Sequence, residues 1–228
     1  MRKINLYQGD CQEILKNLNL DNSILVIDPP FNMNYHYNEY KDNLKEEEYL
    51  DWLTNIIRNF DKFVVIHYPE MIFKIALKLG ITPTKTVSWV YNSNTRKQHR
   101  MIAFFNVKPD FKRVKQPYKN PNDKRIKERI KNGSKGASLY DWWNINQVKN
   151  VSKEKTAHPC QMPLKVMDKI IGILPDGYTI FDTFLGAGTT GVACKKLNKD
   201  FVGIELNIDY FDIAKERIEN TEQQLNIF

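Results

Sequence analysis

Short apolar runs alternate with amphipathic segments at both ends of this chain, and this alternation limits its fold more than any other feature. Residues 23–27 and 63–66 are continuous apolar runs of strand length, which is typical of strands buried on both faces of a parallel sheet. Residues 46–60 gather their apolar side chains on one helical face, and residues 70–79 form a second helix that Gly80 ends. The pattern predicts an α/β fold with a Rossmann-like, doubly wound and mostly parallel sheet.

The same alternation predicts further elements on both sides of a middle region with weak periodicity. Strands are expected at 4–7, 86–91, 101–105, 178–181 and 201–204, and helices at 10–18, 163–173, 189–197 and 208–220. Residues 32–45 are polar and rich in Asn and Tyr, which predicts a mobile loop.

Cysteine usage and the lack of long apolar segments indicate the compartment. The 228 residues suffice for one domain, or one domain with an insert, and for an ample core. Cys11, Cys160 and Cys194 are odd in number and form no CxxC pair, so neither a disulfide framework nor a metal site is expected. Because no apolar run has the length of a signal peptide or a membrane span, we expect a cytoplasmic protein with no membrane partner.

The net charge of +7 is concentrated in the middle of the chain. Residues 96–155 hold 17 Lys and Arg against 5 Asp and Glu, a net charge of +12, and the remainder carries −5. This distribution predicts that a polyanion meets the middle segment. A solvated basic loop is the alternative, but aromatic residues within the segment, such as Tyr118, Trp142 and Trp143, favour an ordered binding module.

A glycine loop near the C-terminus predicts a nucleotide-like cofactor. Residues 186–191 (Gly-Ala-Gly-Thr-Thr-Gly) fit G-x-G-x-x-G between a predicted strand and a helix, where backbone amides approach a ligand closely. Glu205 ends the next predicted strand, at the position from which a carboxylate accepts hydrogen bonds from ribose hydroxyls. A nicotinamide-dependent oxidoreductase is one alternative. However, only 23 residues follow Glu205, so the remaining strands must come from the N-terminal half and the sheet is expected to be circularly permuted.

The four residues Asp28-Pro29-Pro30-Phe31 follow the first buried strand and predict a catalytic loop. Proline fixes φ and has no N–H, and it forces the residue before it into an extended conformation. We expect a stiff loop in which the Asp28 carboxylate and the Pro29 carbonyl accept both hydrogens of an exocyclic amine, while Phe31 stacks on the base. A simple Asp-Pro-Pro turn is the alternative, which the position at a buried strand end disfavours.

Together these segments resemble the S-adenosylmethionine-dependent amino methyltransferases of DNA, in their permuted β group. Residues 28–31 match the DPPY/F motif of that family. Three further segments are similar to its other motifs in the family's own order: His158–Leu164 to HPTQKPL, Asp182–Thr190 to DPFMGSGTT, and Gly203–Glu205 with Tyr210 to G-x-E…Y. Gly9-Asp10-Cys11 matches its N-terminal cofactor segment. The departures are Cys160 and Met162 in the second motif, and Thr183, Leu185 and Ala187 in the third.

The resemblance implies a role for each matching residue. The catalytic residues would be Asp28, Pro29, Pro30 and Phe31. S-adenosylmethionine would be bound by Asp10, Cys11, Asp28, His158, Gln161, Asp182, Phe184, Gly186, Gly188, Thr189, Thr190 and Glu205. Within this set Glu205 would hold the ribose, and Asp10 and Cys11 would lie near the adenine of the cofactor.

The activity that the resemblance implies is site-specific methylation of adenine N6 in double-stranded DNA, with the target base flipped out of the duplex. Asp28 at the first motif position favours adenine. Cytosine N4 remains an alternative acceptor, as does an RNA base, and a catalytically inactive DNA-binding protein is a further alternative.

Basic side chains of the middle segment are the candidates for DNA contacts. They are Arg96, Lys97, Arg100, Lys112, Arg113, Lys124 and Arg125, and residues 124–131 are expected to form a basic helix ended by Gly133. The predicted division is a catalytic half (1–95), a target-recognition region (96–157) and a cofactor-binding half (158–228). The small insert predicts a short recognition sequence. A homodimer and a cognate restriction endonuclease are candidate partners.

Overall fold

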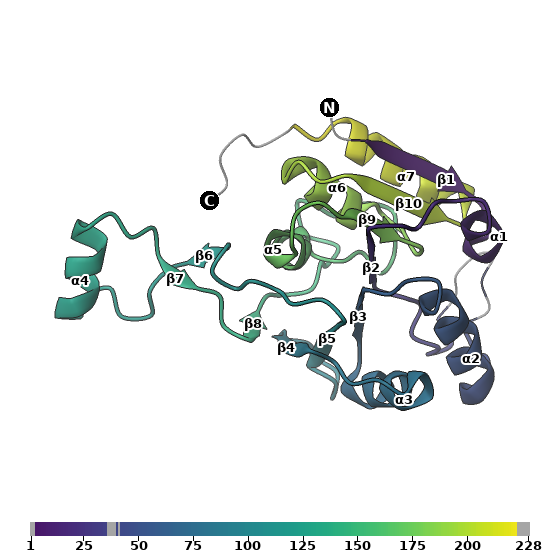
Figure 1. The fold of residues 1–228 in the computed structure, drawn as a ribbon, viewed down its shortest axis with the longest axis horizontal. Coiled ribbons are helices and arrows are strands. Elements are labelled where there is room, and N and C mark those ends of the chain that lie inside the picture. The colour runs from purple at the N-terminus through teal and green to yellow at the C-terminus, as the bar shows by residue number, and fades with distance from the viewer. Residues whose placement is uncertain (1–2, 36–39, 41, 223–228) are drawn as a thin grey trace.

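An eight-stranded sheet forms the centre of the computed structural model, which describes residues 3–35, 40 and 42–222 (Figure 1). Its strand order is β1-β10-β9-β2-β3-β5-β4-β8. The strands from β1 to β3 in this order are parallel to one another, β5 is antiparallel to both of its neighbours, and β8 runs parallel to β4. The predicted α/β class with a mostly parallel sheet is therefore confirmed.

The strands of this sheet are β1 (Ile4–Gln8), β2 (Ser23–Ile27), β3 (Phe63–His67), β4 (Lys85–Val90), β5 (His99–Phe105), β8 (Trp142–Asn144), β9 (Thr179–Asp182) and β10 (Phe201–Glu205). The helices are α1 (Cys11–Leu15), α2 (Glu46–Ile57), α3 (Pro69–Leu79), α4 (Lys124–Lys131), α5 (Leu164–Ile173), α6 (Thr189–Lys196) and α7 (Ile208–Glu219). A separate pair of short strands is formed by β6 (Lys115–Gln116) and β7 (Ala137–Ser138). Within the described ranges, none of the helices combines the length and the apolar character needed to cross a membrane.

Helices cover both faces of the sheet, because successive strand residues point to opposite sides. Ile24 and Val26 of β2 belong to one buried cluster, together with apolar side chains of α5, α6 and α7. Leu25 and Ile27 belong to the other, together with side chains of α1, α2 and α3. The helix that follows β2 and the helix that follows β9 thus lie on opposite faces, although β2 and β9 are neighbours.

Two predicted helices are shorter than expected, for the same local reason. The helix expected at 10–18 ends at Leu15, and the helix expected at 46–60 ends at Ile57. In both cases the chain continues in tighter turns whose amides donate three residues back, as Leu18 N does to Leu15 O and Phe60 N to Ile57 O. The apolar spacing therefore continues beyond the α-helix itself.

The basic middle segment is divided between the sheet and a projecting arm. Its β5 and β8 are strands of the main sheet, whereas β6, α4 and β7 extend away from it (Figure 1). The predicted helix at 124–131 is present as α4, begins at the N-cap Asp123, and has no buried residue. β6 and β7 contain two residues each, and the sequence pattern predicted neither.

Candidate active site

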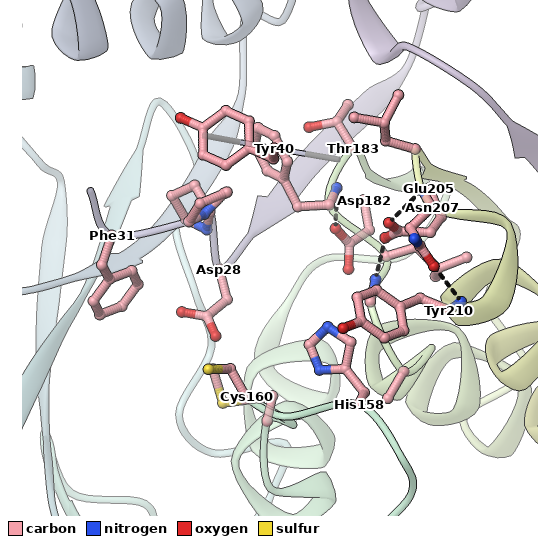
Figure 2. A pocket seen from close by; sticks show the side chains of 18 of the residues that line it. Asp28, Phe31, Tyr40, His158, Cys160, Asp182, Thr183, Glu205, Asn207 and Tyr210 are labelled. Carbon is pink, nitrogen blue, oxygen red and sulfur yellow. Dashed lines mark hydrogen bonds between the residues drawn. The ribbon is translucent and has the colours of Figure 1, made fainter. Parts of the chain in front are cut away.

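A cavity of about 350 Å³ opens at the carboxyl ends of the parallel strands. Asp28 follows β2, Asp182 ends β9, and Glu205 ends β10, and all three line the cavity (Figure 2). β2 and β9 are the neighbouring strands whose following helices lie on opposite faces of the sheet. Ligands of open α/β sheets bind at this kind of switch point.

The Asp28 carboxylate occupies a buried position with one cation beside it. Its two oxygens each lie 3.5 Å from Nη1 of Arg100, which comes from β5. Burial raises the pKa of Asp28 to about 6, and Arg100 opposes this rise. The carboxylate is therefore ionised at neutral pH in the described structure and can accept hydrogen bonds.

A chain of hydrogen bonds fixes the proline loop from below. The Pro30 carbonyl accepts a hydrogen bond of 2.6 Å from the Tyr49 hydroxyl, which lies 3.2 Å from Nε2 of His67. Nδ1 of His67 accepts from the Tyr68 amide at 2.8 Å, so Nε2 carries the proton and donates it to Tyr49. Burial lowers the pKa of His67 to about 3, which keeps this ring neutral.

Phe31 lies within a group of aromatic and cationic side chains. Its ring stacks on His67 at a centroid distance of 4.1 Å and meets Tyr68 edge-on at 5.1 Å. The guanidinium carbon of Arg100 is 4.4 Å from the Phe31 centroid.

The chain after Phe31 is organised around a buried carboxylate. Asp42 is 3% exposed and accepts hydrogen bonds from the amides of Asn32, Met33 and Tyr35 at 2.7 to 3.0 Å. The loop expected at 32–45 is therefore held at residues 32–35, and its residues 36–39 and 41 lie outside the described residues.

The glycine loop joins β9 to α6 as predicted. Asp182 accepts from the Phe184 amide at 2.9 Å and from the Thr190 hydroxyl at 2.5 Å. Burial raises the pKa of Asp182 to about 7. Gly188 is the N-cap of α6 with a φ of 75°, and a Cβ there would lie 2.9 Å from Cα of Ala214. The sequence therefore needs glycine at this position.

Glu205 connects the glycine loop to the end of β10. Its carboxylate accepts hydrogen bonds from the Gly186 amide at 2.7 Å and from the Asn207 amide at 3.0 Å. Asp10 is the N-cap of α1, and both Asp10 and Cys11 line the cavity on the same side. Burial raises the pKa of the Cys11 thiol to about 12, so this thiol stays protonated.

The loop between β8 and α5 closes a third side of the cavity with His158. The imidazole meets the Tyr210 ring edge-on at 4.5 Å, and burial lowers the pKa of His158 to about 4. Gln161 also lines the cavity, but its amide oxygen accepts from Thr156 and its nitrogen donates to the Glu154 carbonyl. Gln161 therefore fixes the loop that carries His158.

Unsatisfied polar atoms in the cavity wall support a polar ligand. The Thr183 hydroxyl and Nδ1 of His158 are buried and have no hydrogen-bond partner among the described residues. Such atoms are costly unless a ligand or water satisfies them. Phe184 and Trp52, 5.3 Å apart, supply an apolar surface in the same cavity. The residues present thus fit a cofactor with both polar and aromatic parts.

The expected DNA-contacting residues lie in different places. Arg96 and Lys97 are exposed in the turn between β4 and β5, Lys112 is exposed, and Lys124 and Arg125 lie on α4. Arg100 instead lines the cavity.

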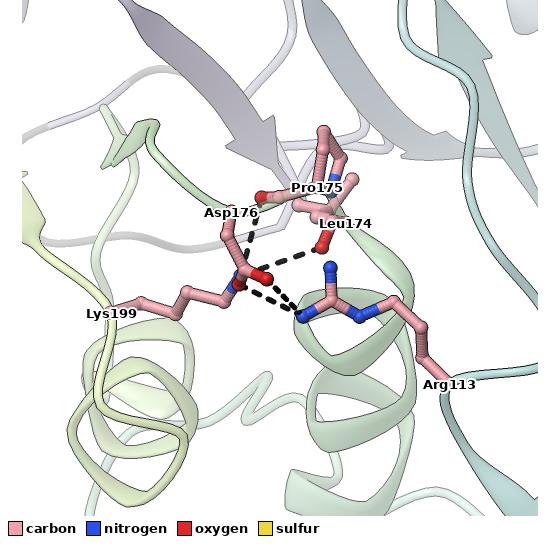
Figure 3. A network of polar contacts seen from close by, with 5 residues as sticks. All are labelled: Arg113, Leu174, Pro175, Asp176 and Lys199. Atoms are coloured by element: carbon pink, nitrogen blue, oxygen red, sulfur yellow. Dashed lines mark hydrogen bonds and ion pairs between the residues drawn. The ribbon is translucent and has the colours of Figure 1, made fainter.

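Arg113 contacts the main body at the base of the arm (Figure 3). Its Nη2 donates to both Asp176 oxygens at 2.8 and 2.7 Å, and Lys199 donates to Asp176 at 2.5 Å. These two cations lower the pKa of Asp176 to about 2.

Several cavity residues carried no signal that sequence reasoning used. Tyr40 stacks on Trp52 at 5.2 Å, and both line the cavity together with Tyr68 and Asn207. Trp52 lies on the predicted helix at 46–60, where an aromatic residue at helical spacing indicates core packing. A signal existed for Asn207, since Asn is a common N-cap and α7 begins immediately after it.

Comparisons with known proteins agree with this geometry. Residues 23–216 match the N6/N4 methyltransferase family model, described as DNA methylase. The chain is 30% identical to the type II methyltransferase M.ScaI of Streptomyces caespitosus, over 96% of this chain and 83% of that protein. It is 29% identical to M.HpaI of Haemophilus parainfluenzae, over 90% of this chain and 71% of that protein.

Solved structures show the same fold. A structure described as the M1.HpyAVI complex with SAM superposes with a TM-score of 0.62 at 25% identity, covering 94% of this chain and 99% of that chain. The PvuII cytosine-N4-specific DNA methyltransferase superposes with a TM-score of 0.69 at 17% identity, covering 97% and 89%, which supports the fold. With the family model matching most of its length, this chain belongs to the N6/N4 DNA methylases, which use S-adenosylmethionine as methyl donor.

Proposed function

We propose that this protein is a site-specific methyltransferase that transfers the methyl group of S-adenosylmethionine to N6 of adenine in double-stranded DNA. The observation that carries the proposal is one cavity with two chemically different ends. Asp28 and Phe31 line one end, and Asp182, His158 and Glu205 line the other (Figure 2). A flipped base and a cofactor can therefore meet within a single space.

The cofactor end is assigned to residues that fit its parts. Glu205 would accept hydrogen bonds from ribose hydroxyls, with Asp10 and Cys11 beside the adenine. The residues around the methionine end would be Asp182, Phe184, Gly186, Gly188, Thr189, Thr190, His158 and Gln161. The unsatisfied Thr183 hydroxyl and His158 Nδ1 add two polar groups to this wall. S-adenosylmethionine would supply an electrophilic methyl group on a sulfonium sulfur.

Asp28 would act on the amine of the target base. An exocyclic amine is a weak nucleophile because its lone pair is delocalised into the ring. Hydrogen bonds from both of its N–H groups, to the Asp28 carboxylate and the Pro29 carbonyl, favour a tetrahedral nitrogen and stabilise the positive charge that develops there. The nitrogen–carbon bond forms as the carbon–sulfur bond breaks, and the surplus proton leaves the nitrogen. Proximity and charge placement supply the catalysis.

Adenine is the preferred acceptor because an aspartate stands at position 28, which is usual for adenine enzymes of the family. Cytosine N4 is the alternative, since the same two acceptors can bind any exocyclic amine. We further propose a circularly permuted order in which residues 1–95 carry catalysis and 158–228 carry cofactor binding.

Residues 96–157 are proposed to contact DNA, mainly through the arm. This range includes the +12 segment, and α4 exposes Lys124 and Arg125 together with further basic side chains. Phosphate contacts from such residues position a protein on the duplex. The relatives named above are type II methyltransferases. A modification enzyme in the cytoplasm with a cognate restriction endonuclease, acting alone or as a homodimer, is the corresponding proposal here.

Methylation of mixed-sequence duplex DNA with methyl-labelled S-adenosylmethionine tests the proposal. After digestion to nucleosides, we expect the label on N6-methyladenine. Label on N4-methylcytosine would replace the proposed acceptor, and no label on DNA would refute the proposed function. Asp28→Ala should abolish labelling and still bind the cofactor, because Asp28 acts on the base. Full labelling by this variant would refute the mechanism.

A further inference from the structure

Arg100 occupies the two positions that the proposed function reserves for the target base. Its guanidinium carbon is 4.4 Å from the centroid of the Phe31 ring, and its Nη1 is 3.5 Å from both oxygens of Asp28. In the proposed reaction Phe31 stacks on the base and Asp28 accepts hydrogens from its amine. One side chain thus covers both groups.

The register of the sheet shows that Arg100 and His67 approach Phe31 from opposite sides. Met101 of β5 pairs with His67 of β3, and Arg100 pairs with Trp89 of β4. Because Arg100 and Met101 are successive strand residues, their side chains point to opposite faces of the sheet. His67 stacks on Phe31 at 4.1 Å with an interplanar angle of 21°. The Phe31 ring is therefore enclosed between His67 and Arg100, and neither face is open to a base.

Arg100 is held mainly by aromatic contacts. Its hydrogen bonds to Asp28 are 3.5 Å long, at the outer limit for such bonds. Its Nε is buried and has no hydrogen-bond partner among the described residues. The Trp89 ring lies 5.2 Å from the guanidinium, in addition to Phe31. A group with loose polar contacts can be displaced without breaking strong hydrogen bonds.

We propose that Arg100 is a displaceable stand-in for the target base, which covers Phe31 and Asp28 until the base enters. This inference rests on the proposed function. When the base arrives, its ring replaces the guanidinium on Phe31 and its amine replaces the guanidinium at Asp28. Arg100 lies at the start of β5, next to the exposed turn that carries Arg96 and Lys97, so its released charge emerges where DNA phosphates are expected. In this role Arg100 sets the free-energy cost of base entry.

The test compares two duplexes that contain the sequence methylated in the labelling experiment. One carries the target base and the other carries an abasic site in its place. The ratio of their dissociation constants measures the gain from inserting the base, because other contacts are shared. We would determine this ratio for the wild type, Arg100→Ala, Arg100→Lys and, as a matched control, Lys97→Ala. Calorimetric binding of S-adenosylmethionine verifies that each variant is folded.

If Arg100 is a stand-in, Arg100→Ala should raise the preference for the target base about three- to tenfold, the factor that matches an ordinary guanidinium–aromatic contact. Arg100→Lys should raise it too, because an ammonium group cannot lie flat on Phe31. Lys97→Ala should weaken both duplexes equally and leave the ratio unchanged. A ratio that falls in Arg100→Ala and is restored in Arg100→Lys would overturn the proposal, since Arg100 would then support the pocket by charge alone. An unchanged ratio would overturn it as well.

These outcomes separate the two proposals. An enzyme that methylates DNA but shows no rise in the ratio refutes only the role of Arg100. A protein that methylates no DNA refutes the proposed function, and the role of Arg100 with it.

Discussion

Asp182 should make the cofactor-free protein less stable as the pH rises, and Asp182→Asn should remove this loss. The carboxyl group is 4% exposed, and burial raises its pKa from 3.8 to about 7. A carboxyl group with a raised pKa is more easily ionised in the unfolded chain than in the fold. Its contribution to stability is therefore complete below pH 3.8 and is lost as the pH rises to 7.

The size of the effect follows from the pKa difference of about three units. Each unit corresponds to about 1.4 kcal/mol, so ionised Asp182 lowers the free energy of unfolding by up to about 4 kcal/mol above pH 7. Asparagine keeps the bond from the Phe184 amide and can present its own N–H group to the Thr190 oxygen. Most of the local geometry therefore survives the substitution.

Urea unfolding of the wild type and Asp182→Asn at pH 5, 6, 7 and 8 would measure the difference directly. We expect the variant to gain stability over the wild type with each step, by about 2–4 kcal/mol in total. The same variant should bind S-adenosylmethionine more weakly, because the carboxylate belongs to the cofactor end of the cavity. A stability difference that does not change with pH would refute the reasoning.

Three further predictions concern other parts of the site. Tyr49→Phe leaves the buried Pro30 carbonyl without its donor, so the free energy of unfolding should fall by about 1–3 kcal/mol in urea and labelling should slow; equal stability would contradict this. Gly188→Ala forces a side chain into a φ of 75° and against Ala214, so calorimetry should show weaker cofactor binding and a protein about 1–3 kcal/mol less stable. The labelling rate should fall below about pH 6, where Asp28 becomes protonated, and be constant above; a rate that rises on acidification would exclude Asp28 as the acceptor.

The sheet and the loops at its edge could be predicted because their signals are local. Apolar runs of strand length ended at Asp28, Asp182 and Glu205, and parallel strands bring their carboxyl ends to one edge. The position of each loop in the chain was enough to place it in space. For this reason the cavity lining from the glycine loop and the proline loop agrees with the residues expected there.

Arg100 shows where such reasoning stops. In the sequence it is one of many basic residues in a charged segment, and nothing local separates it from exposed Arg96. Its direction is set by the antiparallel pairing of β5 with β3 and β4, which depends on residues far away in the chain. Tyr49 is similar, since its helical spacing predicts a core aromatic but cannot reveal that its hydroxyl meets the Pro30 carbonyl.

The arm could be predicted only in part, because its strands are too short for a periodic pattern. α4 carries its own signals, with Asp123 as N-cap and a positive φ at Gly133 after its end. β6 and β7 are set by their pairing with each other, since Lys115 pairs with Ser138 and Gln116 with Ala137. No hydrophobic alternation marks two-residue strands.

The lack of burial along α4 has a consequence for how this protein can change over generations. A side chain that packs against nothing can be replaced at little cost, generally within about 0.5 kcal/mol of folding stability. The sheet, with its two buried clusters, has no such freedom. Selection can therefore vary the outer surface of the arm one residue at a time while the reaction chamber stays the same, so new variants arise without first losing a folded enzyme.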